Sequence, residues 1–128
     1  MDETTVAVYH ARASQLANAM DLCHDDIPAY SAAIGLLAVH SAISYNDAVL
    51  VRLTGKRPRA QDHRKAIAAI RSACTQGGIG DKGVKHLHRL VSAKADVSYG
   101  DEQVKTERIE FLYEAAKRFQ AWAEHLLG

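Results

Sequence analysis

The stretch that decides the fold is the apolar run at residues 32–39, whose sequence is Ala32-Ala33-Ile34-Gly35-Leu36-Leu37-Ala38-Val39. It lies inside a longer predicted helix, from about Pro28 to Thr54, in which apolar residues occur on nearly every face. A helix of that character is typical of the centre of a bundle, where other helices cover all of its sides. The run is far shorter than the roughly 20 apolar residues that span a bilayer. We therefore expect a core helix and no membrane segment.

Helical patterns on both sides of this segment predict four further helices. Apolar residues recur at three- and four-residue spacing over about residues 3–23, 60–75, 82–96 and 102–127. Gly55 is a natural helix stop, and Asp81 and Asp101 are expected to cap the last two helices. Because the connections are short, neighbouring helices should run antiparallel. The sequence thus predicts an all-α, up-and-down bundle of four to five helices.

The same spacing predicts which side chains face the core. In the third helix these are Ile67, Ile70 and Cys74, and in the fourth they are Val84, Leu87 and Val91. For the last helix the predicted inner stripe is Phe111, Ala115, Phe119, Trp122 and Leu126. Its predicted solvent face carries Glu110, Glu114, Lys117 and Glu124.

Composition supports one helical domain spanning residues 1–128. Alanine occupies 22 positions, aromatic residues make up only 6%, and there are two prolines. Alanine has the highest helix propensity, and the residues that favour strands are scarce. Two cysteines, Cys23 and Cys74, are too few for a disulfide scaffold or a cysteine-rich metal site. The N-terminus opens with acidic residues instead of a signal peptide, so we expect a cytoplasmic protein.

Charge is distributed unevenly along the chain, although the net charge is only +1. Residues 1–51 carry −5, residues 52–96 carry +8 and residues 97–128 carry −2. A surface of one sign attracts ligands of the other sign over a long range, so the middle third favours anionic ligands. The alternative is that the acidic first helix packs beside the basic region and neutralises it.

Two basic clusters in the middle third are candidate phosphate contacts. One is the loop and third helix, and the other follows the glycine-rich turn Gly78-Ile79-Gly80-Asp81-Lys82-Gly83. This turn matches G-x-G-x-x-G, but a helix precedes it, so a dinucleotide-binding fold is excluded. Its backbone N–H groups could still bind an anion at a helix N-terminus. The candidates are Lys56, Arg57, Arg59, Arg64, Lys65, Lys82, Lys85 and Arg89.

A polar line crosses the otherwise apolar central helix. His40, Ser44 and Asp47 follow at i, i+4 and i+7, so they share one face. They could form a hydrogen-bond network in the core or the wall of a functional pocket. The seven histidines show no metal-ligand spacing, so we expect neither a metal nor another cofactor.

The order of these features resembles the HEPN superfamily of small helical bundles. The resemblance is carried by Tyr30-Ser31-Ala32-Ala33-Ile34-Gly35-Leu36-Leu37, by Ala93-Lys94-Ala95-Asp96-Val97 and by Trp122-Ala123-Glu124-His125-Leu126-Leu127. Val97 departs from the tyrosine that members often carry there. The resemblance implies either a metal-independent ribonuclease toxin, paired with a nucleotidyltransferase antitoxin, or a module that binds a nucleotide, RNA or a partner protein.

The ribonucleases of this family use an arginine followed closely by a histidine, brought together across a homodimer. Arg89 has no histidine at the required spacing, but Arg57 with His63 and Arg118 with His125 satisfy it. Histidine could accept the 2′-hydroxyl proton while arginine stabilises the developing phosphorane charge. The leading expectation is a non-catalytic, homodimeric binding module for RNA, a nucleotide or a partner. The alternatives are this ribonuclease and a protein-interaction subunit that does not bind nucleic acid.

Overall fold

Helices make up nearly all of the described chain. The computed structural model describes residues 3–56 and 62–128, and within these ranges it contains no strand. The helices are α1 (Glu3–His24), α2 (Ile27–Thr54), α3 (His63–Gly77), α4 (Val84–Ser92), α5 (Lys94–Tyr99) and α6 (Thr106–Leu127). The predicted all-α class is confirmed.

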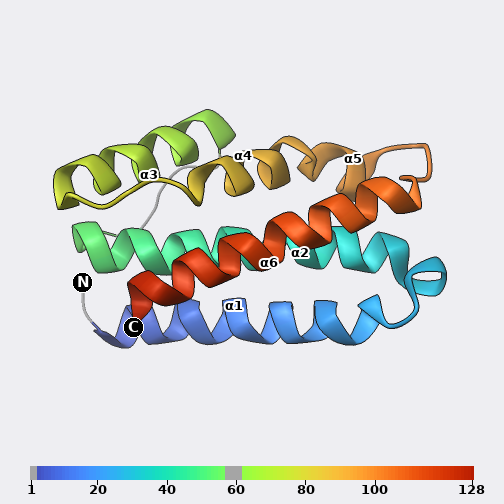
Figure 1. Cartoon of the computed structure of the whole chain (residues 1–128), viewed down its shortest axis with the longest axis horizontal. Helices are drawn as coiled ribbons and strands as arrows, with labels where there is room; N and C mark the ends of the chain where they lie inside the picture. The colour runs from blue at the N-terminus through green and yellow to red at the C-terminus, as the bar shows by residue number, and fades with distance from the viewer. Residues whose placement is uncertain (1–2, 57–61) are drawn as a thin grey trace.

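The central position of α2 is also confirmed. Figure 1 shows α1 on one side of α2 and α6, and the row formed by α3, α4 and α5 on the other side. Every other helix packs against α2, which buries Ile34, Val39 and Tyr45 among its apolar residues. By length and composition, α2 could also cross a membrane, and it is the one such helix in the described residues. Contacts with all five neighbours are those of a core helix, which is consistent with a soluble protein.

The predicted fourth helix is divided in two, which corrects its expected range of 82–96. α4 begins at Val84, α5 ends at Tyr99, and Ala93 separates them. The break lets α5 turn toward α2, where Val97 lies against Gly35. A Cβ atom on Gly35 would lie 3.1 Å from Val97 Cγ1. The close approach of these two helices accounts for the separate α5.

Neither predicted aspartate cap forms. Asp101 lies in the connection before α6, which begins at Thr106 and is preceded by Lys105 without a side-chain cap. Asp81 lies before the N-cap of α4, which is Gly83. By contrast, Asp62 caps α3 by accepting a 2.8 Å hydrogen bond from Arg64 N. The predicted start of that helix at Ala60 lies outside the described residues.

The inner face of α6 differs from the predicted stripe. Ala115 and Phe119 are buried as expected, but Phe111 is 51% exposed and its neighbour Leu112 is buried instead. Adjacent residues differ by about 100° around a helix, so the packing of α6 against both α2 and α4 selects Leu112. The inward residues predicted for the third and fourth helices are all buried: Ile67, Ile70, Cys74, Val84, Leu87 and Val91.

Candidate functional site

A groove between α3 and α4 gathers basic side chains of the middle third. We name it the α3–α4 groove, and its volume is about 470 Å³. Its lining is Arg64, Ile67, Ala68, Arg71, His88, Val91 and Ser92. Helical spacing accounts for this set, because residues three, four or seven apart share a face on each helix. Arg64 and Arg71 therefore line one wall, and His88 and Ser92 line the other.

The α3–α4 groove is suited to an anion. Among the described residues, its lining contains two guanidinium groups, an imidazole and a hydroxyl, and no carboxylate. Arg64 and Arg71 are exposed, whereas Ile67 and Val91 are buried and form an apolar floor. Guanidinium groups bind phosphate oxygens through paired N–H donors. Cations around an apolar floor can hold a phosphate and a flat organic group together.

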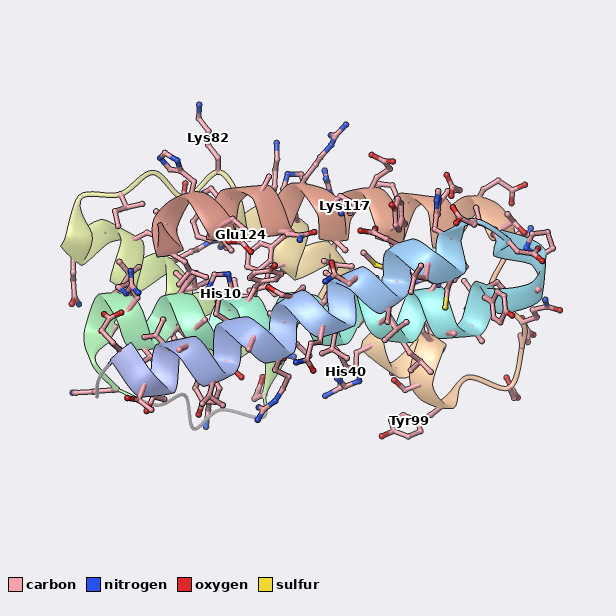
Figure 2. All side chains as sticks on the ribbon, turned by 90° about the horizontal axis from the view of Figure 1, so that it is seen from below. His10, His40, Lys82, Tyr99, Lys117 and Glu124 are labelled. Carbon is pink, nitrogen blue, oxygen red and sulfur yellow. The ribbon has the colours of Figure 1, made fainter. Side chains whose placement is uncertain are left out.

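Of the predicted phosphate contacts that the structure describes, Arg64 lines this groove and the others do not. Lys56, Lys65, Lys82 and Lys85 are exposed at other positions. Lys82 precedes α4, and Figure 2 shows it pointing away from the bundle. Arg89 lines a second groove on the other side of α4. Arg57 and Arg59 lie outside the described residues.

The glycine-rich turn packs against α6 and leads directly into α4. The N–H groups of Val84 and His86 donate to the carbonyls of Asp81 and Gly83. A Cβ atom on Gly83 would lie 2.2 Å from Trp122 Cδ2, so this glycine allows the turn to touch the Trp122 ring. The close contact gives Gly83 a role in packing, and anion binding by the N–H groups of the turn stays a prediction.

The second groove, which we name the α4–α6 groove, has a volume of about 340 Å³. Its lining is His86, Arg89, Glu107, Glu110, Phe111, Glu114, Ala115 and Arg118. Arg89 Nη1 donates to His86 Nδ1 at 3.3 Å, and the Arg89 guanidinium lies 5.5 Å from the Phe111 ring centroid. Burial lowers the pKa of His86, and the positive charges of Arg89, Lys85 and Arg118 lower it further. A neutral His86 can therefore accept the bond that positions Arg89.

The two arginine–histidine pairs stay predictions, because their residues would meet across a homodimer. Arg118 and His125 are both exposed, but only Arg118 lines the α4–α6 groove. Their seven-residue separation corresponds to about 10.5 Å along α6. Arg57 and the side chain of His63 lie outside the described parts of the chain.

The polar line of α2 does not form a hydrogen-bonded chain. His40 is exposed (Figure 2), Ser44 is buried and Asp47 is partly buried. Among the described residues no hydrogen bond joins these three side chains. Burial raises the pKa of Asp47 to about 6, although the positive charge of Arg12 opposes the shift. Of these three side chains, only that of His40 is exposed, so they do not form one face open to solvent.

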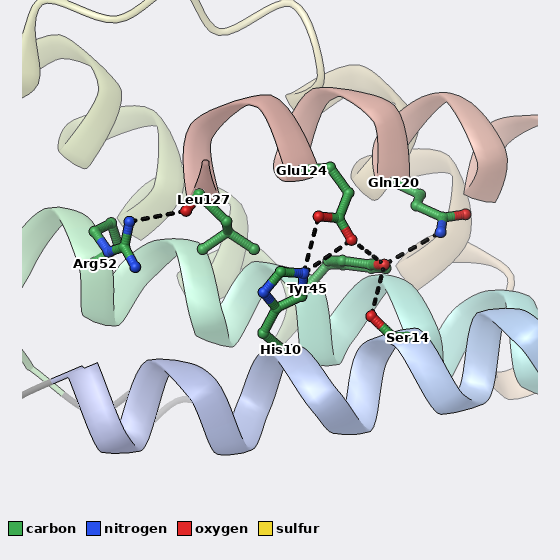
Figure 3. Close-up of polar contacts among 7 residues, drawn as sticks. All are labelled: His10, Ser14, Tyr45, Arg52, Gln120, Glu124 and Leu127. Atoms are coloured by element: carbon green, nitrogen blue, oxygen red, sulfur yellow. Dashed lines mark hydrogen bonds and ion pairs between the residues drawn. The ribbon is translucent and has the colours of Figure 1, made fainter.

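Sequence reasoning missed a polar network between α1, α2 and α6, which Figure 3 shows. His10 Nε2 lies 2.8 Å from Glu124 Oε2, and the hydroxyl of Tyr45 donates to the same oxygen at 2.7 Å. Gln120 Nε2 donates to the Tyr45 hydroxyl at 3.2 Å, and Ser14 Oγ lies 3.4 Å from it. Tyr45 is only 1% exposed, so the network holds helices together and leaves the phenol inaccessible.

Glu124 is therefore not on a free solvent face as predicted. Burial alone would raise the pKa of this carboxyl, but hydrogen bonds from His10 and Tyr45 outweigh burial and lower it. In the sequence, this network is indicated by the i, i+4 spacing of His10 with Ser14 and of Gln120 with Glu124. Beside the network, Arg52 Nη1 donates to the carbonyl of Leu127 at 3.0 Å and holds the end of α6 (Figure 3).

A second polar cluster joins α1 to α6 farther along the same seam. Asp21 accepts hydrogen bonds from Tyr113 at 2.8 Å and from Lys117 at 3.0 Å. His24 bonds to Glu110 and stacks on the Tyr113 ring. Across the parts of the chain that the structure describes, no three His, Cys, Asp or Glu side chains converge on a metal-sized site.

No protein-family model matches the chain, and a search of curated proteins gave no match.

Proposed function

We propose that this protein is a non-catalytic, cytoplasmic module that binds RNA through the α3–α4 groove. One observation carries the proposal: Arg64, Arg71 and His88 line one cavity that has an apolar floor and no carboxylate among the residues that the structure describes. Phosphate contacts supply most of the affinity of nucleic-acid binding, and they need positive charge within reach. The exposed Lys65 and Lys85 extend the positive surface beyond the groove.

The spacing of the two arginines favours a strand over a single nucleotide. Arg64 and Arg71 are seven residues apart, which is about 10.5 Å along α3. Successive phosphates of one nucleic-acid strand are about 3.4 Å apart along the axis. Arginines at this separation can contact two phosphates of one strand, whereas the phosphates of a single nucleotide lie directly next to one another.

The test is a binding titration with a short, fluorescein-labelled single-stranded RNA near neutral pH. Replacing both arginines (R64A/R71A) should weaken binding about tenfold, because hydrogen bonds to charged groups contribute about 1.5–3 kcal/mol when formed and less at exposed sites. The charge-matched control is K105A/R108A, which removes two exposed cations near the start of α6. Equal weakening in both double variants would show non-specific charge attraction, and no RNA binding by the wild type would refute the proposal.

A metal-independent ribonuclease is the second candidate, because His88 shares its groove with two arginines. In that case His88 would accept the 2′-hydroxyl proton and the arginines would stabilise the phosphorane. Incubation of the RNA in EDTA distinguishes the two functions. Cleavage by the wild type that H88A abolishes supports a nuclease in this groove. Loss of cleavage in H63A or H125A would instead place the site at a predicted arginine–histidine pair.

The resemblance to HEPN bundles supports the proposal in outline, since some members bind RNA or nucleotides. The homodimer and the nucleotidyltransferase-type partner that it implies stay predictions. Sedimentation velocity over a range of concentrations tests the homodimer. If neither RNA binding nor cleavage is observed, a protein-interaction subunit becomes the better account of the basic surface.

A further inference from the structure

Phe111 is a large apolar side chain left half exposed in a groove that is otherwise charged. Its exposed fraction is 51%, and it lines the α4–α6 groove with Ala115. The Arg89 guanidinium lies 5.5 Å from the centroid of its ring, within the range of a cation–π contact. An aromatic ring beside arginine is the combination on which unpaired bases stack in single-strand binding proteins.

We propose, on the basis of the proposed function, that Phe111 is the stacking platform for an unpaired base. The ligand is then a single strand of RNA that crosses α4, with its phosphates in the α3–α4 groove and one base on Phe111. Arg89, positioned by its hydrogen bond to His86, contacts the phosphate next to the stacked base. Arg118 lines the same groove and supplies a second cation.

The exposed side of α4 provides a continuous path between the two grooves. With about 100° per residue, Lys85 lies about 60° from His88 on one side and about 40° from Arg89 on the other. His88 lines the α3–α4 groove and Arg89 lines the α4–α6 groove. The exposed Lys85 thus stands between them. A helix is about 10 Å across, so about three or four nucleotides cover the crossing.

The carboxylates of the α4–α6 groove predict which bases are accepted. Glu107 and Glu114 are exposed on α6 and line the groove beside Phe111. Ionised carboxylates only accept hydrogen bonds, and they pair with the exocyclic amino group of cytosine. Uracil has no amino group. We therefore expect cytosine to bind on Phe111 in preference to uracil. We also expect the phosphates to lie beside α4, because the carboxylates on α6 repel them.

The test compares F111A with wild type on short oligocytidylate, oligouridylate and inorganic polyphosphate. Stacking contributes about 1–3 kcal/mol per base, so F111A should weaken oligocytidylate binding by about 5-fold to 150-fold. Polyphosphate binding should not change, because it has no base. F111Y keeps an aromatic ring and should bind oligocytidylate like wild type. The matched control is Y99A, which removes the 84% exposed Tyr99 and should leave binding unchanged. If a 2-aminopurine base is placed in the RNA, its fluorescence should be quenched when the wild type binds, because the base stacks on Phe111. Binding of F111A should not quench this fluorescence.

Each outcome separates this inference from the proposed function. If F111A binds oligocytidylate like wild type while R64A/R71A loses it, the stacking role is overturned and the proposed function stands. If neither variant changes RNA binding, both are overturned. Duplex RNA bound as tightly as the single strand would also overturn the inference, because a paired base cannot reach Phe111. A DNA strand of the same sequence, tested in parallel, shows whether the 2′-hydroxyl contributes.

Discussion

At the scale of single residues, Asp47 shows how burial without a full set of partners affects stability. Its pKa is raised from 3.8 to about 6 by burial, and the positive charge of Arg12 only partly offsets this. The folded state therefore retains a proton between these pH values that the unfolded state has released. Stability should fall as the pH rises through this window, and the cost remains at higher pH.

We predict that D47N stabilises the protein by about 1 kcal/mol near neutral pH, because it removes a partly buried charge that solvent still screens. Urea unfolding at several pH values measures the difference. D101N, at an exposed position in the connection before α6, is the control. If D47N leaves the decline in stability between pH 3.8 and about 6 unchanged, another group causes it.

Gly83 offers a second prediction at this scale. An added Cβ atom would lie 2.2 Å from Trp122 Cδ2, whereas at Gly80 it would meet no atom within 4 Å. Overpacking a close contact costs about 1–3 kcal/mol, so G83A should lower the free energy of unfolding by that amount. G80A, three residues away, should change it little. Equal effects of the two variants would mean that the Trp122 contact is unimportant for stability.

At the scale of elements, Glu124 is the centre of the polar network that joins α1 to α6 over α2. Its folded-state pKa is lowered by His10 and Tyr45 against the effect of burial. The stabilisation is therefore present above the ordinary carboxyl pKa of 4.5 and lost as the pH falls through the lower folded value. It should be fully present near neutral pH.

We predict that E124Q lowers the free energy of unfolding by about 1 kcal/mol near neutral pH, because two charge-assisted hydrogen bonds are lost from a partly exposed site. The difference from wild type should shrink as the pH falls below 4.5, where the wild-type carboxyl also becomes neutral. E107Q, on the exposed face of the same helix, is the control. A difference that stays constant down to acidic pH would contradict the assigned role.

The elements also show how far the sequence determines the fold. The apolar surface of α2 and the spacing of Ile67, Ile70 and Cys74 predicted a core that the structure confirms, because that information is local. The division between α4 and α5 depends on the contact of Val97 with Gly35. These residues are far apart in the sequence, so no local pattern predicts their contact. Likewise, Phe111 and Leu112 are both apolar neighbours, and only the packing of α6 selects which one is buried.

The candidate site divides in the same way. The basic character of Arg64 and its neighbours is visible in the sequence, since charge needs no partner to be recognised. The position of His88 opposite Arg64 and Arg71 requires the packing of α3 on α4. The exposure of Phe111 requires knowing what α6 covers. Residues that act together across two helices were therefore the part that spacing could not predict.

At the scale of the whole molecule, the charge segregation of the sequence has a spatial counterpart. Figure 1 shows α1, from the acidic first third, on the opposite side of α2 and α6 from α3 and α4. α1 therefore does not lie beside the α3–α4 groove, and its Glu3 pairs instead with Arg52 at the end of α2. Such a dipolar molecule orients an anionic strand toward the α3–α4 groove as it approaches.

The salt dependence of RNA binding tests the central claim most directly. For single strands, the slope of log Kobs against log salt changes by about 0.7 for each phosphate neutralised. If Arg64 and Arg71 each hold a phosphate, the slope of R64A/R71A should be shallower than that of wild type by about 1.4. The control K105A/R108A should keep the wild-type slope. An unchanged slope and affinity in R64A/R71A would contradict the assignment of the α3–α4 groove as the RNA-binding site.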